Sequence, residues 1–274
     1  MNRIILLFCL VLSLSACTSK FQKVLKNKDT DYKVKMAEQY YAEKKYTNAQ
    51  QLFESVIQFV KGTPRYEELY LMYANSYYYD KDYENAENIY KTFMEYFPNS
   101  AKAEEVEFMR AYTYFKRSPK AELDQTTTNR AMQLMQSFID AHPTSTRVKE
   151  ATDVIDACRA KLELKDYKTA TLYYDLALYR AAAISYGLLS DYFPDAKQAD
   201  KYKLLTLKSY FKFAENSFVD KQKERFEKVI VEYNDFVDRY SDSPLMTEAK
   251  KIKKQTDQYL NNMTGSRLVS IALS

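Results

Sequence analysis

The sequence predicts an all-α fold, a superhelical array of about five helix pairs with a long connecting helix between the third and fourth pairs. Three observations predict it. Only 3 Gly and 6 Pro occur in 274 residues, too few for a fold of strands and turns. The 26 Tyr and 15 Phe, without any Trp, supply an aromatic core whose rings carry polar tips. A pattern of small and large residues also recurs along the chain, first at a spacing of 37 residues.

The recurring pattern resembles tetratricopeptide repeats. A small residue is followed by an aromatic one three positions on, a second small residue twelve positions on, and large residues four and seven positions beyond that. The small residues belong where two antiparallel helices touch, and the large ones fill the gaps. The first copy is Ala37, Tyr40, Ala49, Phe53 and Val56. The second is Ala74, Tyr77, Ala86, Tyr90 and Phe93, and the fourth is Ala170, Tyr173, Ala182, Tyr186 and Leu189.

Two copies carry insertions between their helices. The third copy is Ala111, Tyr114, Ala131, Met135 and Phe138, with eight additional residues that we expect to form a loop from Arg117 to Asp124. The fifth is Leu207, Tyr210, Val229, Tyr233 and Phe236, with about ten additional residues near Asn216 to Gln222. A degenerate last copy suits a cap, because its outer face has no neighbour to cover.

A long helix is predicted between the third and fourth copies. Pro98 and Ala111 are 13 residues apart, whereas Pro143 and Ala170 are 27 apart. The additional 14 residues are close to four turns at 3.6 residues per turn, so they preserve the buried face. We expect one helix over 147–178 that joins the two groups of repeats rigidly. Its apolar stripe is Val154, Ile155, Cys158 and Leu162.

The N-terminal residues are typical of a lipoprotein signal. Arg3 precedes an apolar stretch that is too short to span a bilayer, which needs about 20 apolar residues. Leu14-Ser15-Ala16-Cys17 then resembles the bacterial lipobox, which implies acylation of Cys17; ordinary cleavage after Ala16 is the alternative. Thr18, in place of Asp, favours the outer membrane, and the lack of a following acidic cluster favours its periplasmic side.

These features predict five segments. They are a signal peptide at 1–16, a lipidated tether at 17–30, repeats one to three at 31–146, the long helix with repeats four and five at 147–260, and a tail at 261–274.

The mature chain resembles the BamD family, the tetratricopeptide lipoproteins of the outer-membrane β-barrel assembly machinery. Beyond the lipobox and the repeats, the resemblance is carried by Phe108-Met109-Arg110, the insertion before Arg130-Ala131, the long helix into Tyr173-Tyr174, and Tyr192-Phe193-Pro194-Asp195. It implies a protein that docks through its C-terminal repeats on a BamA-like barrel subunit, beside other lipoproteins of the machinery. It also implies N-terminal repeats that receive unfolded outer-membrane proteins.

Two sets of residues are candidate binding sites. Positions that face the concave side of such repeats would form a peptide groove, and here they are Glu38, Tyr41, Asn75, Tyr78, Tyr112 and Phe115. Surface aromatic residues of this kind also occur without a ligand, where they only shield the hydrophobic core from solvent. The basic run Lys250, Lys251, Lys253 and Lys254 would dock an acidic partner or anionic lipid, unless it is a solvated helix face.

Little in the sequence points to catalysis. The single His, His142, lies before Pro143 and reads as a solvated turn residue, and Cys158 reads as an apolar packing residue. We expect no cofactor and no metal, because no Gly-rich loop and no Cys or His cluster occurs. A net charge of +4 does not indicate a nucleic-acid partner. The alternatives to barrel assembly are a scaffold for another cell-envelope process and a nutrient-capture lipoprotein, which usually has Trp platforms.

Overall fold

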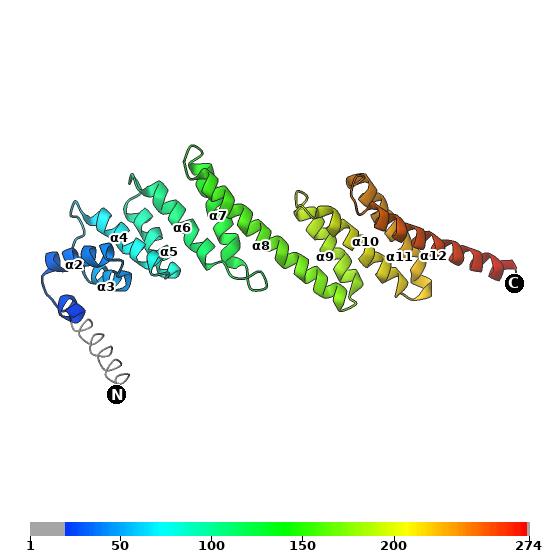
Figure 1. The fold of residues 1–274 in the computed structure, drawn as a ribbon, viewed down its shortest axis with the longest axis horizontal. Helices are drawn as coiled ribbons and strands as arrows, with labels where there is room; N and C mark the ends of the chain where they lie inside the picture. The colour runs from blue at the N-terminus through cyan, green and yellow to red at the C-terminus, as the bar shows by residue number, and fades with distance from the viewer. Residues whose placement is uncertain (1–19, 273–274) are drawn as a thin grey trace, which may run out of the picture. The chain divides into compact units, whose positions relative to one another are not determined.

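The computed structural model describes residues 20–272, and side-chain surroundings as far as Met263. Within this range the chain consists of helices and turns, without strands (Figure 1). The predicted signal peptide and Cys17 lie outside the described residues. The chain divides into two compact units: unit 1 comprises Met1–Pro119 and Leu123–Cys158, and unit 2 comprises Lys120–Glu122 and Arg159–Ser274.

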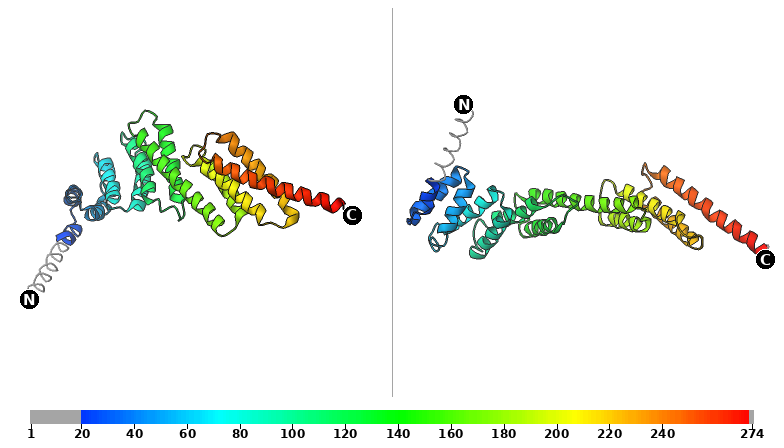
Figure 2. Two further views of the ribbon diagram at one scale, coloured as in Figure 1. Left: turned by 45° about the vertical axis from the view of Figure 1, so that its right-hand side comes forward. Right: turned by 90° about the horizontal axis from the view of Figure 1, so that it is seen from below.

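Unit 1 contains the first three predicted helix pairs. They are α2 (Thr30–Ala42) with α3 (Tyr46–Val56), α4 (Tyr66–Tyr79) with α5 (Tyr83–Tyr96), and α6 (Ala103–Arg117) with α7 (Thr126–Ala141). Figure 2 shows the helices of each pair side by side. The small residues of the pattern are at most 1% exposed, namely Ala37, Ala49, Ala74, Ala86, Ala111 and Ala131. Their size lets the paired backbones approach, which confirms the predicted repeats.

The turns inside three of the helix pairs share one backbone feature, a residue in the left-handed conformation. Lys44, Lys81 and Ala177 adopt the left-handed conformation, with φ of 58°, 67° and 58°. In the first turn the N–H of Lys45 then donates to the carbonyl of Tyr40 at 2.8 Å, which closes the helix end. The equivalent bonds to Tyr77 and Tyr173 are 3.0 and 2.9 Å long. The aromatic residue of the pattern therefore also marks where each first helix ends.

The predicted loop and long helix are both present. Residues 118–125 separate α6 from α7, one residue from the expected limits. Helix α8 (Val148–Asp175) is continuous over 28 residues. Val154 and Cys158 are buried in the core of unit 1, whereas Ala170 is buried in that of unit 2. Ile155 and Leu162, from the predicted stripe, are half-buried.

Unit 2 contains the end of α8 and four further helices. They are α9 (Tyr179–Tyr192), α10 (Ala199–Glu215), α11 (Val219–Arg239) and α12 (Met246–Ala272). The additional residues of the fifth repeat do not form a loop, since only three residues separate α10 from α11. They lengthen the two helices instead, to 17 and 21 residues. No Gly or Pro interrupts this stretch, so helix continues almost to the turn.

A last helix covers the fifth pair. Ala249, Ile252 and Thr256 of α12 are buried, and the first two pack with residues of α10 and α11 in one core cluster. The helix continues beyond residue 260, where a separate tail was expected, to Ala272. None of the described helices combines the length and the apolar character needed to cross a bilayer.

Candidate functional site

A row of aromatic rings runs across the three helix pairs of unit 1. We call it the aromatic ladder, and its members are Tyr41, Tyr46, Tyr78, Tyr79, Tyr83, Tyr112 and Phe115. Ring centroids lie 6.3 Å apart for Tyr41 and Tyr79, and 5.5 Å apart for Tyr79 and Tyr78. The row continues from Tyr78 to Tyr112 at 6.5 Å and from Tyr112 to Phe115 at 5.6 Å. The structure therefore places four of the six predicted groove residues, Tyr41, Tyr78, Tyr112 and Phe115, in one row of rings.

The repeat explains this alignment. Tyr41, Tyr78 and Phe115 are successive residues at a spacing of 37, each four positions after the small residue of its first helix. Equivalent positions of stacked pairs lie beside one another, so a ring at this position in each pair produces a row. Tyr46 and Tyr83, also 37 apart, begin the second helices and widen the row.

The ladder rings are half-buried, except Tyr79, which is 47% exposed. Burial, with smaller effects from neighbouring phenols, raises the pKa of Tyr41 and of Tyr78 to about 12. Their hydroxyls therefore remain protonated at neutral pH and can donate hydrogen bonds. Lys116 lies 4.9 Å from the ring centroid of Tyr112, which adds a cation at one end of the row.

Asn75 lies among the rings but is already engaged. The Tyr90 hydroxyl donates to the Asn75 side-chain carbonyl at 2.6 Å. A second hydrogen bond, between Asn75 and the Tyr41 side chain, opposes the rise in the pKa of Tyr41. Asn75 thus serves to hold the ladder, with its side-chain carbonyl bonded inside the second helix pair.

Glu38 lies outside the row of rings. Its carboxylate forms an ion pair with Arg65, which also lies 3.5 Å from Glu68. This ion pair joins α2 to the start of α4. Glu38 is therefore a connection between the first two helix pairs, and the ladder itself consists of neutral rings.

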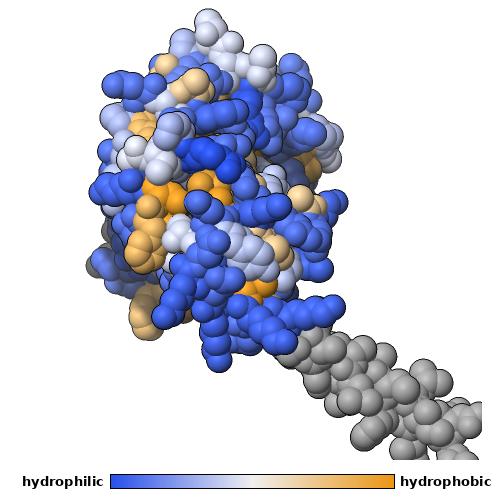
Figure 3. Space-filling view, turned by 90° about the vertical axis from the view of Figure 1, so that its left-hand side faces the viewer, coloured by the Kyte–Doolittle hydropathy of each residue, from blue (hydrophilic) through white to orange (hydrophobic). Residues whose placement is uncertain are grey.

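Figure 3 shows unit 1 from the left-hand side of Figure 1. Hydrophobic side chains form small patches there, bordered by hydrophilic ones. A surface of this kind differs from the broad apolar patches that mark strong protein–protein interfaces.

Polar contacts that the sequence analysis missed tie the turn that follows a helix pair back to the first helix of the same pair. Ser100 donates to Glu67, Ser145 to Glu104, and Ser243 to Asp200. Each acceptor stands seven positions before the small or apolar packing residue of its first helix, so the repeat spacing could have identified it. Glu67 and Glu104 also lie in helix first turns, where a carboxylate is favoured by the helix dipole.

Ion pairs make further connections. Arg110 Nε donates to Glu87 Oε1 at 2.7 Å, joining α5 to α6 with side chains only 17% and 8% exposed. His142, expected to be a solvated turn residue, instead lies 2.7 Å from Glu107 Oε2 and against the ring of Phe138. The turn after α7 returns to α6, and this brings the two side chains together.

The predicted basic run lies on the outer face of α12. Lys250, Lys251 and Lys254 are exposed, because the buried face of this helix is formed by Ala249, Ile252 and Thr256. Lys253 differs, since it pairs with Asp257 at 2.7 Å. Three of the four lysines therefore present their charge to solvent.

Unit 2 also exposes apolar side chains at two turns. Leu176 and Leu178 at the α8–α9 turn are 59% and 52% exposed, and Phe218 and Val219 at the α10–α11 turn are 83% and 80% exposed. Both turns lie on the same side of unit 2 (Figure 1). We call these four residues the apolar turn edge.

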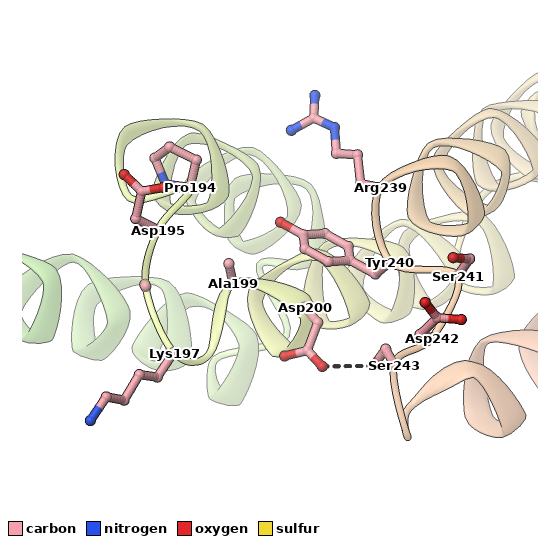
Figure 4. A pocket seen from close by; sticks show the side chains of 11 residues that line it. Pro194, Asp195, Lys197, Ala199, Asp200, Arg239, Tyr240, Ser241, Asp242 and Ser243 are labelled. Carbon is pink, nitrogen blue, oxygen red and sulfur yellow. Dashed lines mark hydrogen bonds between the residues drawn. The ribbon is translucent and has the colours of Figure 1, made fainter.

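A polar cavity of about 400 Å³ lies between two other turns of unit 2. Figure 4 shows Tyr240 and Ser243 of one turn facing Asp200 of the other, with the hydrogen bond between Ser243 and Asp200 drawn. Arg239 at its rim is held by Asp235 at 2.9 Å and Asp191 at 3.2 Å. We interpret the cavity as the junction between two helix pairs.

Among the side chains that the structure describes, no group of three or more His, Cys, Asp or Glu could hold a metal ion. A family model described as YfiO, outer membrane lipoprotein, matches residues 27–225, well over half of the chain. The match extends through both units, from the short turn before α2 into the first turns of α11. A comparison with curated proteins gives no match.

Proposed function

The chain belongs to the YfiO family of outer membrane lipoproteins, the BamD family that its sequence resembles, and on this premise we propose that it is a periplasm-facing scaffold of the β-barrel assembly machinery. In this proposal acylated Cys17 anchors the protein. Unit 1 binds unfolded outer-membrane proteins, and unit 2 binds the BamA-like barrel subunit.

The aromatic ladder carries the proposal for unit 1. An unfolded barrel protein offers extended segments with alternating aromatic side chains and unpaired backbone groups. Half-buried tyrosines provide ring surface at a small entropic cost, together with hydroxyls that stay protonated. Because the row crosses three helix pairs, it can accept several residues of an extended segment, such as the C-terminal strand of a barrel protein.

A double variant tests the ladder. Tyr78→Ala with Phe115→Ala removes two rings from different helix pairs, and we expect it to weaken binding of a barrel-protein C-terminal peptide by roughly 2 kcal/mol or more, the scale of aromatic hot spots. Fluorescence titration measures the affinity, and thermal unfolding checks that the array is intact.

The fourth repeat offers a matched control. Tyr174 and Tyr179 occupy the positions of Tyr78 and Tyr83, and their ring centroids are 5.3 Å apart against 5.5 Å. We expect Tyr174→Ala to leave peptide binding unchanged. A stable Tyr78→Ala, Phe115→Ala protein with wild-type affinity would show that the rings only cover the core.

Two surfaces of unit 2 support docking of the barrel subunit there. The apolar turn edge exposes Phe218 and Val219, and α12 exposes Lys250, Lys251 and Lys254. An exposed aromatic residue supplies buried area on association, whereas outward lysines favour an acidic partner surface.

Co-purification in mild detergent, read by mass spectrometry, tests both the identity of the partners and the docking surface. We expect the wild-type protein to retain a BamA-like subunit, and Phe218→Ser with Val219→Ser to lose most of it. Phe59, 76% exposed in unit 1, provides the control variant Phe59→Ser. Recovery of a different set of envelope proteins would contradict a role in barrel assembly.

A further inference from the structure

The chain is folded almost immediately after the proposed acylation site. Residues 20–25 form a short helix in which Phe21 and Val24 are only 8% and 7% exposed. The Phe21 ring lies against that of Tyr40, with centroids 5.8 Å apart. The sequence suggested a tether over 17–30, but within that segment the structure buries Phe21 and Val24, and Phe21 packs on Tyr40 of α2.

A lipid on Cys17 would therefore restrict the position of the first helix pair. Phe21 is the fourth residue after Cys17, and an extended chain reaches at most about 3.6 Å per residue, or about 14 Å in all. This step depends on the proposed acylation. Given it, Phe21 stays within about 14 Å of the acylated Cys17, and the surface next to Phe21 stays near the lipid headgroups.

The surface next to Phe21 includes the α2–α3 turn. Tyr40, which Phe21 contacts, lies near the end of α2, and Lys45 Nζ lies 5.7 Å from the same Tyr40 ring centroid. Lys20 and Lys23 on the short helix are exposed, as are Lys44 and Lys45 in the turn. Glu43, which bonds Lys45 at 2.6 Å, is the acidic residue of the turn.

The charge of the sequence is concentrated in this region. Residues 20–35 contain six lysines and two aspartates, a net charge of +4, whereas the remaining residues carry 35 basic and 35 acidic side chains. A basic segment beside a lipid anchor is a second signal of the kind that strengthens membrane attachment.

We propose that helix 20–25 and the α2–α3 turn form an anchor-proximal basic surface, Lys20, Lys23, Lys44 and Lys45, that binds anionic phospholipid headgroups. The surface would hold the first helix pair on the membrane in addition to the acyl chains. The ladder begins in the same region, at Tyr41 and Tyr46, so a bound segment would be presented close to the bilayer.

Vesicle flotation of the mature chain carrying Cys17→Ser, and therefore lacking the acyl group, tests this surface. We expect binding to vesicles of phosphatidylethanolamine with phosphatidylglycerol, much weaker binding to neutral phosphatidylcholine vesicles, and release by salt. Each lysine at an anionic surface changes binding by roughly 5-fold, so Lys20→Gln with Lys23→Gln should lower it roughly 25-fold. Lys44→Gln with Lys45→Gln tests the turn in the same way.

The control is Lys221→Gln with Lys223→Gln, which removes the same charge from exposed positions of α11. We expect it to leave vesicle binding unchanged. Equal losses in the control and the N-terminal variants, or no binding of the parent chain to phosphatidylglycerol vesicles, would overturn the proposal. Because the tested chain carries no acyl group, such a failure is separate from a failure of the proposed acylation of Cys17.

Discussion

The Tyr90 hydroxyl and the Asn75 side-chain carbonyl are joined by a 2.6 Å hydrogen bond beneath the aromatic ladder. Tyr90 is fully buried, and its burial raises the pKa of its phenol far above neutral pH. The bond links the two helices of the second pair and fixes the amide that contacts Tyr41. It makes the second pair the support of the ladder.

Tyr90→Phe should destabilise unit 1 by about 1–2 kcal/mol, because the Asn75 carbonyl is left without its donor. Tyr186→Phe in the fourth repeat is the matched comparison. The Tyr186 hydroxyl is bonded to Thr171, which also donates to the Tyr167 carbonyl at 2.9 Å. Thr171 keeps that second bond in the variant, so we expect a smaller loss of unfolding free energy. Urea unfolding of both variants gives the two free energies. A Tyr90→Phe protein as stable as wild type would mean that water replaces the hydroxyl.

The Arg110–Glu87 pair should matter for the junction between the second and third helix pairs. Arg110→Leu leaves the Glu87 carboxylate buried and unpaired, which should cost about 3–5 kcal/mol of unfolding free energy. Arg110→Leu combined with Glu87→Leu should recover most of that loss, since two apolar side chains leave no buried charge without a partner. A double-mutant cycle measured by urea unfolding checks this. Additive effects of the two substitutions would show that the side chains do not interact.

Lys203 should control the acid stability of unit 2. Burial opposes ionisation of Glu232 and Asp235. The hydrogen bonds and charge of Lys203, added to those of Lys228 on Glu232 and of Arg239 on Asp235, together outweigh it, so both carboxyl pKa values are lowered. Burial also opposes the charge on Lys203, yet its bonds to Asp235 and Glu232 raise its pKa. The carboxylates therefore stabilise the fold above their unfolded pKa values of about 4, and this is lost as pH falls through the lowered folded values. The lysine contribution is complete below about pH 10 and is lost above its raised pKa.

Lys203→Met should cost about 3 kcal/mol or more near pH 7 and flatten the decline of stability in acid. Lys228→Met is the control, because Lys228 also bonds Glu232, at 2.7 Å, but its side chain is 47% exposed. We expect the control to lose less than about 1 kcal/mol. Thermal unfolding from pH 7 to pH 3 gives the comparison. Identical acid profiles for wild type and Lys203→Met would rule out the network as their cause.

Cys17→Ser should abolish acylation. The variant should then accumulate as a precursor of higher peptide mass, or release its processed body into the soluble periplasmic fraction. Mass spectrometry and membrane fractionation measure both results. Cys158→Ala, which alters a cysteine buried in unit 1, should leave the anchor unchanged. Normal fractionation and mass of Cys17→Ser would show that another residue holds the protein at the membrane.

The repeat positions could be predicted because helix pairs constrain residue size at fixed spacing. Alanines such as Ala74 and Ala86 are required where backbones approach, and Tyr90 and Phe93 fill the space beside them. The fifth repeat was less predictable. Spacing shows how many residues are added between Leu207 and Val229, but not whether they extend a helix or form a loop.

Most of the polar contacts could not be predicted from the sequence. Lys203 resembles any surface lysine, and only the approach of α10 to α11 shows that it is 8% exposed between two carboxylates. The role of Asn75 was hidden for the same reason, since its partner lies 15 residues away on the other helix. By contrast, the ladder followed from the 37-residue spacing of Tyr41, Tyr78 and Phe115.

Helix α8 has a consequence for how the protein unfolds. Its buried residues end at Cys158 and resume at Ala170, and the eleven residues between them are exposed or half-buried. Tertiary packing supplies most helical stability in proteins. In this stretch Tyr167 packs on the unit 2 core and Glu163 accepts from the Tyr202 hydroxyl, and the other residues depend mainly on the helix's own backbone bonds. Amide protons of residues 159–169 should exchange with solvent faster than those at either end of α8. The two cores can then open as separate cooperative units, and one can melt while the other remains folded.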